Sequence, residues 1–153
     1  MAERVVTAAT RRARQMMLGG MVFGHAVGLG VIGLALALGG PGAALTAALG
    51  FAAVVVFYTV GQALEVVASE MPTAHGLILV LASYAVRVIG IAGGLWFLLG
   101  LPQLAPHVSR PWLAASVAAT VVAWVTGVVL VAARQRVPVY DSDYQPPVGQ
   151  DDD

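Results

Sequence analysis

The sequence predicts an all-α integral membrane bundle of four transmembrane helices, with both termini in the cytoplasm. No Asp, Glu, Lys or Arg occurs in the fifty residues between Arg14 and Glu65. A bilayer's hydrocarbon core is about 30 Å thick, so a helix needs roughly 20 apolar residues to cross it. Of the 153 residues, 59% are hydrophobic and 10% are charged, whereas an average soluble domain has about 25% charged residues. This composition indicates no second, soluble domain.

Short segments rich in glycine, proline or polar residues separate the four predicted spans. Gly39-Gly40-Pro41-Gly42 divides the long uncharged segment into two crossings, and Ser69–Thr73 and Gly100–Pro106 form the next two loops. Pro111 suits the first turn of the last span, where a helix needs no N–H donor. The predicted spans are 16–38, 43–68, 75–99 and 111–133. They are flanked by a basic N-terminal arm, residues 1–15, and an acidic, largely disordered tail, residues 134–153.

Arginine placement sets the orientation. All eight basic residues are Arg, and six of them lie in the arm or the tail. The positive-inside rule then places both termini in the cytoplasm of a bacterial plasma membrane. The arm can lie on the anionic inner leaflet through Arg4, Arg11, Arg12 and Arg14, or it can act only as a topology anchor.

A cleaved signal peptide is the main alternative to the first span. The basic start and Ala35-Leu36-Ala37 imitate one. The apolar run is, however, longer than the roughly 7–15 residues usual in a signal peptide. We therefore expect the first span to remain in the protein.

Two charged residues fall inside the predicted spans. Arg87 lies in the middle of span three, and Glu65 lies near the inner end of span two. A charge inside a bilayer is costly and usually faces the bundle interior with a partner. Side chains tilt toward the N-terminus of their helix, so in antiparallel neighbours the two charged ends converge.

Polar neighbours share the faces of these two residues at helical spacing. The predicted polar cluster comprises Tyr58, Gln62, Glu65, Ser83, Tyr84 and Arg87, with His25 of the first span as a further candidate. One interpretation is a buried ion pair that fixes how the helices register. The other is an ion-binding, proton-relay or partner-docking site, because charges within a membrane are often functional.

Small residues recur every four positions on the spans. Gly20, Gly24 and Gly28 form one stripe, and Gly90 and Gly94 another. Small residues let membrane helices approach closely. The stripes can serve packing within the monomer, or they can form a face for a homo-oligomer or for another membrane protein. Trp124 is expected to pack between helices.

Several classes of function find no support in the sequence. The chain has no cysteine, which excludes thiol catalysis and thiolate metal sites. Its three histidines are scattered, and no catalytic triad, zinc motif or phosphate loop is present. Gly28-Leu29-Gly30-Val31-Ile32-Gly33 matches a dinucleotide-binding pattern by letter but lies inside a span. We expect no enzyme, no cofactor, no metal site and no nucleic-acid partner.

Three short motifs carry a family resemblance. They are Ser83-Tyr84-Ala85-Val86-Arg87, Arg110-Pro111-Trp112-Leu113 and Arg134-Gln135-Arg136-Val137-Pro138-Val139-Tyr140-Asp141. With four short spans and a basic N-terminus, the chain resembles the actinobacterial branch of the ATP synthase protein I family. The resemblance covers most of spans two to four and the start of the tail.

The resemblance implies a membrane protein that helps to assemble or stabilise the c-subunit ring of F-type ATP synthase. In that role, Arg87 and Glu65 would hold the bundle and the Gly20/Gly24/Gly28 face would meet the partner. The family's possible role in magnesium supply is discounted, because the spans lack the clustered oxygen ligands it would need. The alternatives are a small transporter or ion-permeation protein that uses the polar cluster, or an accessory subunit of another membrane complex.

Overall fold

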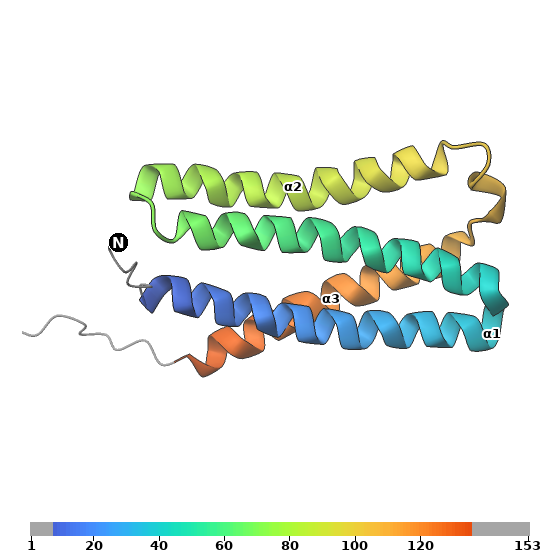
Figure 1. The fold of residues 1–153 in the computed structure, drawn as a ribbon, viewed down its shortest axis with the longest axis horizontal. Coiled ribbons are helices and arrows are strands. Elements are labelled where there is room, and N and C mark those ends of the chain that lie inside the picture. Colours follow the sequence, from blue (N-terminus) through green and yellow to red (C-terminus); the bar gives the residue numbers. More distant parts are fainter. Residues whose placement is uncertain (1–7, 136–153) are drawn as a thin grey trace, which may run out of the picture.

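The computed structural model describes residues 8–135, which form three α-helices and one short 3-10 helix, with no strand among them. The helices are α1 (Ala8–Ala68), α2 (Thr73–Leu99), η1 (Ala105–His107) and α3 (Arg110–Arg134) (Figure 1). The all-α class is therefore confirmed. All three α-helices are long and apolar enough to cross a membrane.

The prediction of four separate helices is wrong, because one bent helix, α1, contains both of the first two predicted spans. Within α1 only Gly40 leaves helical geometry, at φ 76° and ψ −172°. A positive φ is open to glycine because it has no Cβ. The following Pro41 has a fixed φ that suits the first turn of a helix. The chain thus reverses at a single residue, without the loop expected to separate two helices.

The reversal gives α1 two arms that lie side by side, as Figure 1 shows. The first arm is residues 8–39 and the second is residues 41–68. A small core of Ala35, Ala43 and Ala47 packs inside the bend. Thr46 then ties the bend to the α2–α3 connection, because its Oγ1 accepts the N–H of Ser109 at 3.2 Å.

Apart from the start of α1, the other helix boundaries lie within two residues of the predicted spans. α2 begins at Thr73 directly after Pro72, and α3 begins at Arg110 with Pro111 in its first turn. α1 begins at Ala8, so the second half of the predicted arm already belongs to a helix. Arg4 and the tail from residue 136 onward lie outside the described residues.

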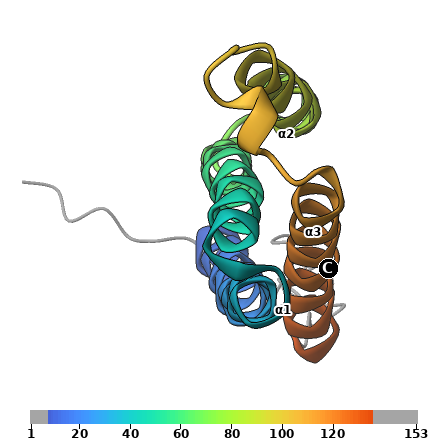
Figure 2. The same cartoon turned by 90° about the vertical axis from the view of Figure 1, so that its right-hand side faces the viewer.

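The two remaining helices pack on different parts of α1. α3 crosses behind both arms, whereas α2 runs along the second arm (Figures 1 and 2). No extended interface joins α2 and α3 in the described part of the chain. Figure 2 shows the result, with α2 at one edge of the bundle and α3 on its flank. The contact between α2 and the second arm holds the charged residues.

Candidate functional site

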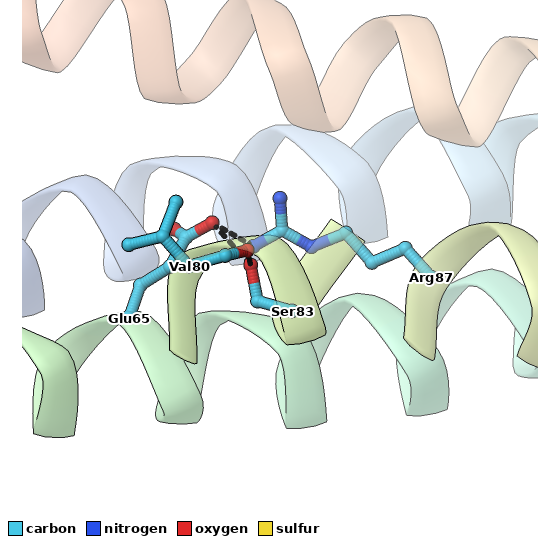
Figure 3. A network of polar contacts seen from close by, with 4 residues as sticks. All are labelled: Glu65, Val80, Ser83 and Arg87. Atoms are coloured by element: carbon cyan, nitrogen blue, oxygen red, sulfur yellow. Dashed lines mark hydrogen bonds and ion pairs between the residues drawn. The ribbon is translucent and has the colours of Figure 1, made fainter. Parts of the chain in front are cut away.

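An ion pair joins α2 to the second arm of α1 (Figure 3). Arg87 Nη2 donates to Glu65 Oε1 at 2.8 Å. The same carboxylate oxygen accepts a hydrogen bond from Ser83 Oγ at 2.9 Å. The Ser83 side chain is fully buried, and the Arg87 and Glu65 side chains are 11% and 26% exposed. Charge-assisted hydrogen bonds of this length are among the stronger ones in proteins.

Helix geometry explains why these three side chains meet. Ser83 and Arg87 are one turn apart on α2, so they share a face. The hydroxyl of Ser83 also lies 2.7 Å from the carbonyl of Val80, and its one proton is shared between this oxygen and Glu65. Figure 3 shows the arginine reaching along α2 toward the carboxylate, as the opposite tilt of antiparallel helices requires.

Gly61 makes room for the guanidinium, and sequence reasoning missed it. A Cβ at position 61 would lie 2.5 Å from Arg87 Nε and 2.9 Å from its Cγ. Gly61 is buried, so the arginine stem rests directly on the backbone of the second arm. The available signal was spacing, since Gly61 stands one turn before Glu65.

Two tyrosines of the polar cluster flank the guanidinium. Its central carbon lies 5.2 Å from the ring centroid of Tyr58 and 5.4 Å from that of Tyr84. A cation within about 6 Å of an aromatic face is attracted by the ring quadrupole. Tyr58 also contacts Trp124 of α3, with ring centroids 5.6 Å apart. The aromatic contacts thus extend from α2 across the second arm to α3.

The structure brings together five of the seven residues of the predicted cluster: Tyr58, Glu65, Ser83, Tyr84 and Arg87. Gln62 lies beside them, but its buried Oε1 has no hydrogen-bond donor. His25 is placed apart. Its Nδ1 lies 2.8 Å from the carbonyl of Met21, and its ring meets Phe51 edge to face at 5.3 Å.

The glycine stripe of the first arm packs inside the chain. Gly20, Gly24 and Gly28 are all buried. Cβ atoms at Gly20 and Gly24 would collide with Trp124, which is 1% exposed as the sequence led us to expect. The interpretation of this stripe as a partner face is therefore corrected, because α3 and the second arm already cover it.

The second stripe also meets a ring of the same chain. A Cβ at Gly90 would collide with Phe57, and one at Gly94 would touch Phe57 at 3.4 Å. Both stripes allow close helix contact within the monomer, which small residues permit in lipid.

A cavity of about 590 Å³ opens where α1 begins and α3 ends, and we call it the terminal cavity. All three α-helices line it, so it lies between the elements rather than on one of them. Glu65 and Gln62 line it from the second arm, Tyr84 from α2, Arg12 from the first turns of α1, and Gln135 from the position after α3. The carboxylate of the ion pair therefore borders this cavity at the end of the bundle where α1 begins and α3 ends.

The predicted arm contributes to the same end. Arg11 and Arg14 are exposed, and the backbone carbonyl of Arg12 accepts a hydrogen bond from Gln135 Nε2 at 3.1 Å. Thr10 Oγ1 donates to Glu70 at 2.6 Å and thereby ties the start of α1 to the turn before α2. Within residues 8–135, no group of three or more His, Cys, Asp or Glu side chains could hold a metal ion.

Comparisons with protein-family models, curated proteins and solved structures gave no match. The fold and the polar cluster thus define a class rather than a family. The three long apolar helices fit a membrane-spanning protein, and among the described residues 8–135 an ion pair joins two adjacent helices.

Proposed function

We propose that the chain is a non-enzymatic accessory or assembly protein of a larger membrane complex, with F-type ATP synthase and its c subunits as the partner. The geometry that supports an accessory role is the use of the charged groups. Arg87 and Glu65 form an ion pair with each other, and this pair joins α2 to α1. The sequence resemblance suggests which complex is involved.

The surface on offer to a partner is the outer face of α2. Only Gly76 and Ser83 of this helix are buried, and it is the least covered of the three helices. Its large apolar side chains point away from the bundle, with Trp96 80% exposed. In lipid, hydrophobicity does not favour another helix over acyl chains as the neighbour of such a face. Whether a partner helix binds there therefore depends on how closely the two surfaces pack.

Two exposed glycines allow a matched test of this surface. Neither Gly93 on α2 nor Gly33 on the first arm has an atom within 4 Å of where its Cβ would lie. Both positions are also exposed, so a longer side chain such as leucine can extend outward from the monomer. We expect affinity purification in mild detergent to recover c subunits with the wild type and with Gly33→Leu, and to lose them with Gly93→Leu. Clean recovery of the wild-type chain without any synthase subunit would contradict the proposed partner.

The proposed orientation has both termini in the cytoplasm. It is supported by the position of Arg11, Arg12, Arg14 and Arg134 near the ends of α1 and α3 that lie together in Figure 1. Because the chain has no cysteine, single-cysteine variants can report topology. A membrane-impermeant thiol reagent added to intact cells should label Gln103→Cys and spare Gln135→Cys, and the reverse pattern would invert the orientation.

A second candidate, a small transporter or ion-permeation protein, has one observation in its favour. The terminal cavity reaches Glu65 from one end of the bundle. A hollow nearer the other end is lined mainly by apolar side chains such as Leu95, Leu99 and Val117, which offer an ion no comparable ligands. Flux in reconstituted vesicles that Glu65→Gln abolishes would favour this candidate over an accessory role.

A further inference from the structure

A groove runs between α2 and α3, and we call it the interhelix groove. It consists of two hollows of about 250 and 480 Å³ that share Val117. In the larger hollow, Leu95 and Leu99 of α2 stand with Leu113 and Ala114 of α3. α2 and α3 have no extended interface in the described part of the chain, which leaves the space between them open. A long, mainly apolar groove of this size suits a ligand with a hydrocarbon tail.

The smaller hollow is lined by Arg87 of α2 and Tyr58 of the second arm. Arg87 donates to Glu65 through Nη2, and its Nε is fully buried without an acceptor. Its Nη1 also has no acceptor within residues 8–135, but this nitrogen keeps accessible surface. Figure 3 shows Nη1 directed away from the second arm. The guanidinium therefore still has N–H donors to offer to a ligand beside it.

Depth and charge narrow the ligand further. Arg87 lies near the middle of α2, which spans Thr73–Leu99, so it is about 20 Å from either end of the helix. Charged lipid head groups lie outside the hydrocarbon core and do not reach this depth. Glu65 already balances the charge of Arg87, so a charged ligand would leave an uncompensated charge in hydrocarbon, which is costly. The ligand's acceptor is therefore a neutral group such as a carbonyl oxygen.

We propose that the interhelix groove binds an isoprenoid quinone from the bilayer. The planar head group carries neutral carbonyl acceptors, and one of them would accept a hydrogen bond from Arg87 Nη1. The ring of Tyr58 lines the same hollow, and planar rings stack favourably. The isoprenoid tail would pass Val117 into the larger apolar hollow. This site is independent of the proposed partner complex, because it lies between α2 and α3 rather than on the outer face of α2.

Two compounds that differ only in their carbonyl groups test the proposal. The purified full-length protein is equilibrated in detergent with a naphthoquinone that carries a phytyl tail, or with the naphthalene that carries the same tail. The compound that stays with the protein through gel filtration is then extracted and measured. We expect retention of the quinone over the naphthalene by about tenfold, the ratio expected for one hydrogen bond to a charged group. Equal retention would assign the groove to hydrocarbon of any kind and would overturn the proposal.

The double variant Glu65→Gln/Arg87→Met assigns the preference to the arginine. It removes the donor together with the carboxylate that the donor balances, so no unpaired charge remains. The ratio of quinone to naphthalene should fall close to unity. An unchanged ratio would overturn the proposed hydrogen bond. If this variant does not fold, the comparison of the two compounds on the wild type still decides.

A pair of alanine variants assigns the tail to the groove. Ala114 and Ala115 are neighbouring exposed residues of α3, and Ala114 lines the larger hollow whereas Ala115 does not. Ala114→Leu narrows the hollow, so quinone retention should fall several-fold, and Ala115→Leu should leave it unchanged. Equal retention by the two variants would overturn the placement. Recovery of c subunits is measured on the same samples, and a variant Ala114→Leu that loses c subunits but keeps the quinone would assign the groove to a partner helix instead.

Discussion

The two helix contacts of α1 are built in different ways. At the contact with α3, the α1 backbone packs closely against an aromatic ring and against the α3 backbone. Trp124 lies on Gly20 and Gly24, and a Cβ at Gly127 would collide with the carbonyl of Gly19. Against α2, few residues are buried and an ion pair joins the helices. Hydrophobicity gives helices no drive to associate in lipid, so close packing or polar bonds must supply it. The contact with α3 relies mainly on close packing, whereas the contact with α2 adds an ion pair to the packing of Gly90 and Gly94 against Phe57.

The α1–α3 contact should be the more easily broken by added volume. Gly127→Ala places a Cβ against the Gly19 carbonyl, and backbone cannot move away as a flexible side chain can. We expect a loss of about 3 kcal/mol, the upper end of the usual cost of overpacking. Unfolding in detergent with increasing dodecyl sulfate measures this change.

The matched control for this change is Gly93→Ala, since no atom lies within 4 Å of its Cβ position. It should leave stability unchanged or raise it slightly through the helix preference for alanine. Equal stability of the two variants would show that α1 and α3 do not approach as closely as described.

The α1–α2 contact should be the more easily broken by removing charge. Arg87→Met leaves Glu65 without its cation, and breaking a fully buried pair costs about 3–5 kcal/mol. Because the Glu65 side chain is 26% exposed and borders a cavity, we expect a smaller loss of about 2 kcal/mol. The same unfolding assay applies.

The double variant Glu65→Gln/Arg87→Met sharpens this prediction. It removes both charges, so most of the lost stability should return. If the double variant is as unstable as Arg87→Met, the loss comes from the arginine stem and its aromatic contacts rather than from an unpaired carboxylate. The α1–α2 contact would then not be held by its charges.

Gly61 combines close packing with the ion pair, because its missing side chain makes room for Arg87. Gly61→Ala would push against Arg87 Nε and Cγ. A long side chain can shift, so we expect a loss of only about 1 kcal/mol, the low end for overpacking. A thermal melt in detergent should detect it. In the Arg87→Met background the cost should shrink, and an undiminished cost would place the clash elsewhere.

The sequence predicts the ion pair between α1 and α2 better than it predicts the close packing of α1 and α3. Charged residues are so rare in the spans that Arg87 and Glu65 had few other partners, and their tilt toward each other follows from helix direction. Apolar packing is less specific, because glycine recurs on several faces. The sequence therefore could not decide between Trp124 and a partner protein as the neighbour of Gly20 and Gly24.

The predicted number of helices was wrong because of the backbone conformation at residues 39–42. Four consecutive turn-forming residues, 39–42, predict a break between two helices. The chain needs only Gly40 to leave helical geometry, so helix continues on both sides of it. Gly61 was overlooked because a lone glycine in a helix has no distinctive pattern until its neighbour is known. His25 was offered to the polar cluster by depth alone, and its ring faces Phe51 instead.

The smallest expected effect comes from removing one serine hydroxyl from the α1–α2 contact and one from the α1–α3 contact. Ser83 and Ser116 are both fully buried. Ser83 donates to the Glu65 carboxylate at 2.9 Å, and Ser116 donates to the carbonyl of Ala47 at 2.6 Å. Hydrogen bonds between membrane helices average about 0.6 kcal/mol, and bonds to charged groups are stronger than bonds to neutral ones.

We therefore expect Ser83→Ala to cost about 1 kcal/mol and Ser116→Ala about 0.6 kcal/mol in the dodecyl sulfate assay. Alanine keeps the small volume in both places, so packing changes little. Ser83→Ala should cost less in the Glu65→Gln/Arg87→Met background, where a neutral amide oxygen replaces the charged acceptor, whereas Ser116→Ala should cost the same there. Equal behaviour of the two serines in both backgrounds would mean that the two contacts do not differ in the way that their geometry indicates.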